Sequence, residues 1–314
     1  MVSYMINQIS IIPGMHKILQ ISLIFLLLPV MGFSQQADLE AAMDRAVTAG
    51  VDMQQIEQIR QRAAGSVSDA TLADIMAPIA DLAEKDMPTE FMVQKVLEGL
   101  AKGIPSGRMK PVLDAIHAHT PRAVMITNRW VEKPDVSPFI QALGDQEPRF
   151  RNDLVNASLK SLTLQVSPEQ IESVLNELGS TLVLKDTSPH VIAAAVGVLP
   201  DMPASMMNSA GIRRVIAKAI RGGFSAADIQ KLPGAMNAAE RRSQLPAASI
   251  LSGMSTQIGN GVPANQVLQN LFNGNINAGP PSGIPGRPDG KPGGRPDGRG
   301  QGQGNGQGNG GPGH

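Results

Sequence analysis

The chain has 314 residues, and its 27 lysines and arginines are matched by 27 aspartates and glutamates. This balance excludes the general electrostatic attraction that draws basic proteins to nucleic acid. The absence of cysteine excludes disulfide bonds, and the aromatic content of 3% leaves an aliphatic core, which favours packed helices over β-sheets.

Residues 1–34 have the character of a secretory signal peptide. They contain no acid and one base, Lys17, followed by a mostly apolar stretch over 18–30. We expect the true start at Met15, cleavage near residue 34, and a mature protein that is periplasmic or extracellular. The apolar stretch is shorter than the roughly 20 residues that span a bilayer, so no integral membrane span is expected after cleavage.

Apolar residues recur with helical spacing throughout the body of the chain. Leu72, Ile75, Ile79 and Leu82 form one such stripe, and Ser167-Pro168-Glu169-Gln170 has the pattern of a capping box. The pattern predicts an all-α protein built as an array of helical hairpins, arranged either as a solenoid or as a bundle in two halves.

A short phrase of glycine, an apolar residue, and proline or serine occurs in two similar sets of three. The sets are Gly65–Ser68, Met87-Pro88 and Gly103–Pro105, then Gly223–Ser225, Leu245-Pro246 and Gly261–Pro263. We interpret the phrase as a helix junction: glycine ends one helix in the left-handed conformation, the apolar residue packs inward, and proline or serine begins the next helix. Glycines at 50 and 211 are expected at junctions too. The two sets come from a duplication or from the shared requirements of helical hairpins, and both readings stay open.

The composition divides the body and separates a tail from it. We expect an N-terminal helical half over 35–133, an irregular joint over 134–150 and a C-terminal helical half over 151–275. The tail, 276–314, is rich in glycine and proline and repeats Gly-Arg-Pro-Asp-Gly from Gly286 and from Gly294. Because it has almost no apolar residues to bury, it is expected to be disordered.

The run Glu98-Gly99-Leu100-Ala101-Lys102-Gly103-Ile104-Pro105 resembles a junction found in a class of uncharacterised, exported bacterial helical proteins. In that class a similar run ends one helix and a proline starts the next. The resemblance covers about residues 45–116. It implies a helical fold and export, and it implies no activity.

No residue pattern predicts catalysis, a metal site or a cofactor. His117 and His119 point to different sides of a helix and are expected near a helix end, because Ile116 closes an apolar stripe. Met202, Met206 and Met207 could hold copper as soft thioethers, but core packing is the simpler interpretation.

Two groups of residues are candidates for binding a partner. Trp130 with Arg129 is the kind of pair that anchors interfaces, although a place in the core is the simpler interpretation for the only tryptophan. Arg214, Lys218 and Arg221 form a basic stripe on one helix face, suited to an acidic partner or, more simply, to solvent.

These observations favour an exported, non-catalytic scaffold or binding module for a protein, a peptide or a cell-envelope polymer. The alternative is an envelope enzyme with its site between the two helical halves. A third possibility is a structural envelope protein, which would self-associate as its concentration rises.

Overall fold

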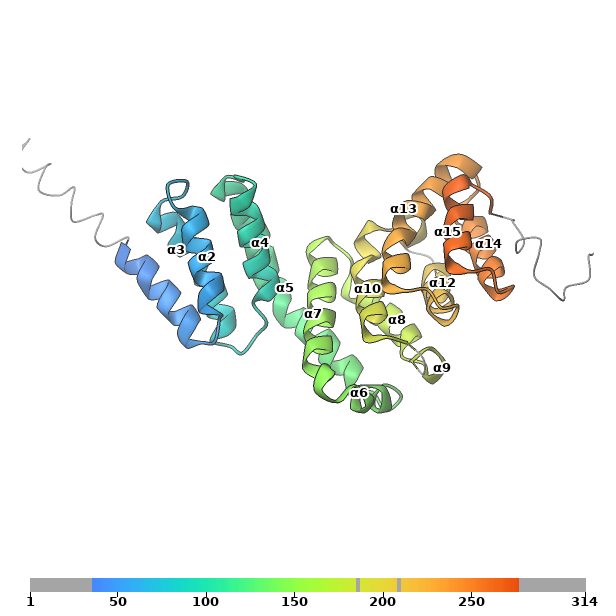
Figure 1. Cartoon of the computed structure of the whole chain (residues 1–314), viewed down its shortest axis with the longest axis horizontal. Coiled ribbons are helices and arrows are strands. Elements are labelled where there is room, and N and C mark those ends of the chain that lie inside the picture. Colours follow the sequence, from blue (N-terminus) through green and yellow to red (C-terminus); the bar gives the residue numbers. More distant parts are fainter. Residues whose placement is uncertain (1–35, 185–186, 208–209, 277–314) are drawn as a thin grey trace, which may run out of the picture. The chain divides into compact units, whose positions relative to one another are not determined.

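A computed structural model describes residues 36–184, 187–207 and 210–276, and within these ranges all regular secondary structure is helical (Figure 1). The all-α prediction is therefore confirmed. The helices lie over residues 36–48, then at α2 (Met53–Ala63), α3 (Asp69–Ala83), α4 (Glu90–Ala101), α5 (Ser106–Val131), α6 (Ser137–Leu143), η1 (Gly144–Gln146), α7 (Glu147–Thr163), α8 (Pro168–Leu178), α9 (Thr181–Leu184), α10 (Pro189–Gly197), η2 (Leu199–Asp201), α11 (Ala204–Met207), α12 (Ala210–Arg221), α13 (Ala226–Ser243), α14 (Ala247–Gly259) and α15 (Ala264–Asn273).

The helices stack in two rows, with alternate helices of the chain in contact. One row contains the neighbours α2 and α4, and the series α7, α10, α13 and α15. The other row contains α3, α5, α8, α12 and α14. Contact between alternate helices is the arrangement of stacked helical hairpins, so the expected helical array is confirmed.

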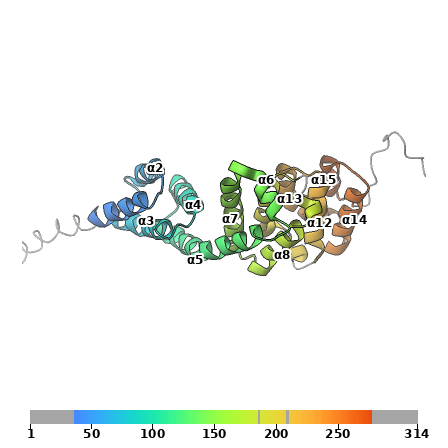
Figure 2. The same ribbon diagram turned by 90° about the horizontal axis from the view of Figure 1, so that it is seen from below.

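Helix α5 is 26 residues long and contributes to the packing at both of its ends. His117 contacts Asp81 of α3, whereas Trp130 contacts Phe150 of α7 and Leu175 of α8. Figure 2 shows α5 as one uninterrupted helix, although Pro111 and Pro121 lie within it. The segment 134–150, expected as an irregular joint, contains α6, η1 and the first residues of α7.

Three of the predicted junctions have the geometry of a Schellman motif. Gly103, Gly223 and Gly261 have φ values of 61°, 83° and 74°. The next amide bonds back to the carbonyl five residues earlier, as from Ile104 to Gly99 at 2.9 Å. Serine or proline then occupies the N-cap, and Ser225 completes a capping box with Asp228.

At three other junctions, two of which are the predicted Met87-Pro88 and Leu245-Pro246, the left-handed residue is not glycine. Asp86, Gln165 and Gln244 have φ values of 55°, 67° and 55°. After Asp86 and Gln165 the next amide again bonds to the carbonyl five residues earlier, whereas the amide of Leu245, after Gln244, bonds to Ser243 Oγ at 3.2 Å. Gly211, in contrast, lies inside α12 and not at the expected junction. The left-handed position is thus set by how a helix ends, and glycine only makes it easier to adopt.

The core is aliphatic, with a small aromatic cluster at the α5–α7 contact. The ring of Phe150 lies 6.3 Å from that of Trp130 and 5.7 Å from that of Phe139. At the C-terminal end of the described residues, Ile276 is buried against α14, and its carbonyl accepts a hydrogen bond from Gln257 Nε2 at 2.7 Å. The ordered body therefore includes Ile276, one residue beyond the expected boundary.

The predicted signal peptide, 1–34, and the tail from 277 onward lie outside the described residues. Within the described ranges, no helix combines the length and the apolar character that crossing a membrane requires.

Candidate binding surface

A groove of about 510 Å³ runs along the exposed face of α10, between α7 and α13. Its floor is formed by the small residues Ala193, Ala194 and Gly197. Because Ala193 and Ala194 precede Gly197 by four and three positions, all three share one face of α10, while Ile192, Ala195 and Val196 are buried beneath. We call this surface the α10 groove.

Contacts with α7 hold the floor in place. The hydroxyl of Ser161 donates to the carbonyl of Val196 at 2.8 Å, and Lys160 Nζ donates to the carbonyl of Gly197 at 2.8 Å. A Cβ on Gly197 would lie 3.7 Å from Cβ of Ala157, which is ordinary packing distance. The low floor therefore follows from small side chains on α10, with two larger helices beside it.

The rim of the α10 groove carries charges of both signs. Lys160 Nζ lies 2.9 Å from Asp201 Oδ2, and His190 Nδ1 lies 3.5 Å from Asp153 Oδ2. The side chain of His190 is 57% exposed. Such a rim suits polar recognition around an inserted segment, with charges that can fix its orientation.

The lining of the α10 groove offers little for catalysis. His190 and Asp153 could act as a base and its orienting partner, but none of the described residues lining the groove is a serine, threonine or cysteine.

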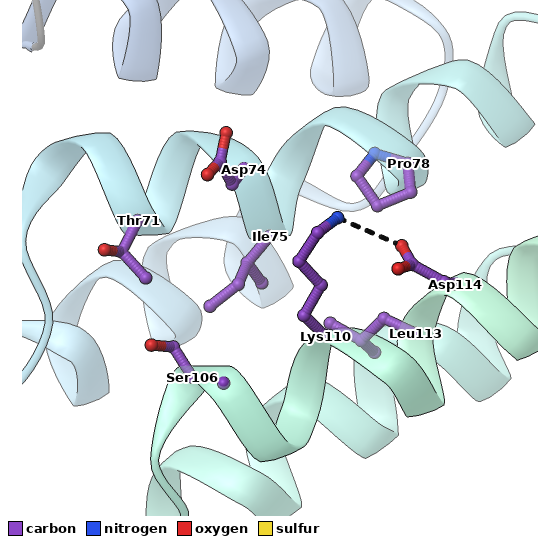
Figure 3. Close-up of a pocket in the computed structure, with 9 residues that line it drawn as sticks. Thr71, Asp74, Ile75, Pro78, Ser106, Lys110, Leu113 and Asp114 are labelled. Carbon is purple, nitrogen blue, oxygen red and sulfur yellow. Dashed lines mark hydrogen bonds and ion pairs between the residues drawn. The ribbon is translucent and has the colours of Figure 1, made fainter.

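A second, smaller hollow of about 180 Å³ lies between α3 and α5 (Figure 3). Ile75, Pro78 and Leu113 supply its apolar lining. Lys110 turns towards Asp114, one helical turn further along α5, with Nζ and Oδ1 3.2 Å apart. The amine of Lys110 is thus paired with a carboxylate and not with a hydroxyl group that could act as a nucleophile.

His117 of α5 makes a second contact between the two helices that form this hollow. Its Nε2 is 2.5 Å from Asp81 Oδ2, and Lys85 Nζ is 2.8 Å from the same oxygen. Hydrogen bonds from Lys85 and then from His117 lower the pKa of Asp81. The expectation that His117 and His119 lie near a helix end is wrong, because α5 continues to Val131.

Trp130, a predicted binding candidate, is buried in the α5–α8 contact. It is 2% exposed, and its Nε1 donates to the carbonyl of Leu175 at 2.6 Å. Its neighbour Arg129 is exposed and pairs with Glu172 of α8, with Nη1 and Oε1 2.9 Å apart. Together they join two helices, and the indole offers no surface to a partner.

The basic stripe lies on α12, away from the residues of the α10 groove. Arg214 and Arg221 are exposed, and Lys218 Nζ bonds Ser255 Oγ of α14 at 2.6 Å. The opposite face of α12, including Ile212 and Ile216, is buried. The structure does not bring this stripe together with Trp130 and Arg129.

The α10 groove is not predicted in the sequence analysis, although Ala193-Ala194-Ala195 and Gly197 signal a helix with an unusually small-residue face. Met202 and Met206 are buried and belong to the core. Over the described ranges, no group of three or more histidine, cysteine or acidic residues could hold a metal ion.

Comparison of the chain with protein-family models, with curated proteins and with solved structures finds no match.

Proposed function

We propose that this chain is an exported, non-catalytic helical-repeat protein that binds a segment of a partner protein in the α10 groove. The observation that carries the proposal is the groove itself, with its floor of small residues and its rim of mixed charge. Its volume of about 510 Å³ falls within the range of about 300–1,000 Å³ that is usual for binding pockets.

The chemistry of the groove favours a protein segment over other partners. A floor of alanine and glycine lets the backbone of a partner approach α10 closely, and leaves room for its larger side chains. A nucleic acid would require an excess of basic residues, but Lys160 is matched by Asp201 and His190 by Asp153. The paired rim supports recognition of a segment with both polar and apolar side chains.

Export rests on residues 1–34 and on the resemblance of Glu98–Pro105 to a junction in exported bacterial proteins. N-terminal sequencing of the protein recovered from its native cells tests this part of the proposal. A mature chain that begins close to Gln35 supports export, whereas an intact leader in the cytoplasmic fraction contradicts it.

The enzyme alternative would use His190 and Asp153, which form a histidine–carboxylate pair among the described residues of the groove. If the α10 groove is a binding surface, His190→Ala should weaken capture of the partner without abolishing any chemical turnover. Accumulation of an unprocessed small molecule in cells that carry His190→Ala would favour the enzyme.

Site-specific photo-crosslinking in the native cell tests the binding function. A photoreactive residue at the exposed position Gln230, on the groove wall, should give one discrete crosslinked protein. The crosslink should disappear with Ala194→Trp, which fills the groove, and persist with Ser252→Trp, a matched change at an exposed position of α14. Unchanged crosslinking in the Ala194→Trp variant would refute the proposal, provided that its circular dichroism matches that of the wild type.

A further inference from the structure

At one junction of the array, the apolar residue that follows the left-handed position is exposed to solvent. The apolar residue after the left-handed position is buried at four other junctions, with exposures of 6% at Val51, 5% at Val166, 3% at Phe224 and 3% at Val262. Ile104 makes the same Schellman bond but is 37% exposed. At the four other junctions this side chain is part of the core, so the exposure of Ile104 marks a place where the packing is interrupted.

The interruption follows from the length of α5. In the same row of helices, α7, α10, α13 and α15 each contact the next, whereas α4 packs mainly on α2 and α5 and has no comparable contact with α7. Helix α7 packs on α5 instead. The face of α4 that a following helix would cover is therefore open.

A groove of about 210 Å³ lies at this open face, between α4 and α5, and we call it the α4–α5 groove. Its apolar lining includes Ile104, Met109, Leu113 and Val112, which is 43% exposed. Gly99 shapes its floor, because a Cβ there would lie 2.2 Å from Sδ of Met109. The glycine lets Met109 lie directly across α4.

The rim of the α4–α5 groove is cationic. Lys95 Nζ and Lys102 Nζ lie 2.7 Å and 2.5 Å from the carboxylate of Glu98. These bonds, first from Lys102 and then from Lys95, lower the pKa of Glu98 to about 2, so the single acid is charged and is matched by two bases. Arg108 is exposed and forms no ion pair within the described part of the chain.

We propose that the α4–α5 groove is a second docking surface, which binds a partner peptide with a large apolar side chain flanked by carboxylates. The apolar side chain lies over Ile104 and Val112, and the carboxylates face Arg108 and Lys95. At about 210 Å³ the groove is smaller than the usual pockets for whole small molecules, and it suits one or a few peptide side chains. The first turn of α5, whose free amides carry partial positive charge, adds to the attraction for an acidic peptide.

A random peptide library displayed to the full-length protein tests this proposal. We expect enriched peptides to combine a large apolar residue with neighbouring aspartate or glutamate. Binding of an enriched peptide should fall at least about tenfold with Val112→Glu and with Arg108→Glu. It should be unchanged with Leu164→Glu and Arg221→Glu, which are matched changes at exposed positions elsewhere.

The Ala194→Trp variant separates this surface from the α10 groove, since it should retain the acidic peptides that Val112→Glu loses. The proposal is overturned if no acidic–apolar motif is enriched, or if Leu164→Glu and Arg221→Glu weaken binding as strongly. It is overturned equally if sedimentation shows self-association of the wild type that Val112→Glu abolishes, because the occupant would then be a second copy. Circular dichroism of each variant confirms that the helices are intact.

Discussion

Replacing Trp130 by phenylalanine tests whether this residue is a structural anchor of the α5–α8 contact. The change removes the bond from Nε1 to the carbonyl of Leu175, which has a net value of about 0.5–1.5 kcal/mol. The smaller ring also buries roughly 40 Å² less apolar surface, which corresponds to about 1 kcal/mol. Leu175 keeps the hydrogen bond from the amide of Gly179 at 2.8 Å, so its carbonyl is not left without a partner. We expect a total loss of about 2 kcal/mol.

Arg129→Ala is the matched comparison. Arg129 pairs with Glu172 at a distance of 2.9 Å, but its side chain is 55% exposed, and exposed ion pairs contribute about 0–1 kcal/mol. Urea unfolding followed by far-UV circular dichroism gives both values, and it does not depend on the tryptophan that one variant removes. A loss below about 0.5 kcal/mol for Trp130→Phe, or a larger loss for Arg129→Ala, would refute the reasoning.

Three further predictions address the junctions, the α4–α5 groove and the end of the body. Gln244→Gly should stabilise the protein by about 0.5–1 kcal/mol in thermal unfolding, because glycine relieves the left-handed backbone at φ 55°; a loss of stability would mean that the glutamine side chain contributes there. NMR titration should give Glu98 a pKa of about 2, and Lys102→Ala should raise it towards the usual 4.5. Since this pKa is lowered by folding, the stability it contributes is present above about pH 4.5 and is lost as the pH falls towards 2; an unshifted titration would contradict the ion pairs. Deleting residues 278–314 should leave the urea midpoint unchanged, whereas Ile276→Ala should lower the free energy of unfolding by about 2 kcal/mol, because its side chain is buried. Equal losses of stability in the two variants would refute the placement of the end of the folded body at Ile276.

The positions of many helices could be predicted because the determining contacts are local. The stripe from Leu72 to Leu82 lies on α3, and the capping box at Ser167 begins α8. Glycine at 103, 223 and 261 indicated left-handed junctions because few other residues adopt that conformation readily. Glutamine carries no such signal, so Gln165 and Gln244 could not be recognised as left-handed residues; the junction at Gln244 was indicated by Leu245-Pro246 instead.

Local sequence patterns could not predict that α5 is continuous. Thr120-Pro121 resembles a helix start, yet the helix continues through it, and the hydroxyl of Thr120 donates to the carbonyl of Ile116 at 2.8 Å. Packing of α5 on helices at both of its ends offsets the hydrogen bond that Pro121 cannot make. The burial of Trp130 has the same origin, because it depends on Phe150 and Leu175, which are distant in the sequence.

The sequence by itself determined that this protein is a series of helices joined by tight left-handed junctions. Helical period and junction bonds connect residues within about five positions of one another, so they can be read from short stretches. Only the tertiary structure decided which faces are covered and which are open. The α10 groove combines residues from Asp153 to Gln230, and the exposure of Ile104 results from α7 packing on α5 and not on α4. Such surfaces depend on which helices stack, and that depends on contacts between residues far apart in the chain.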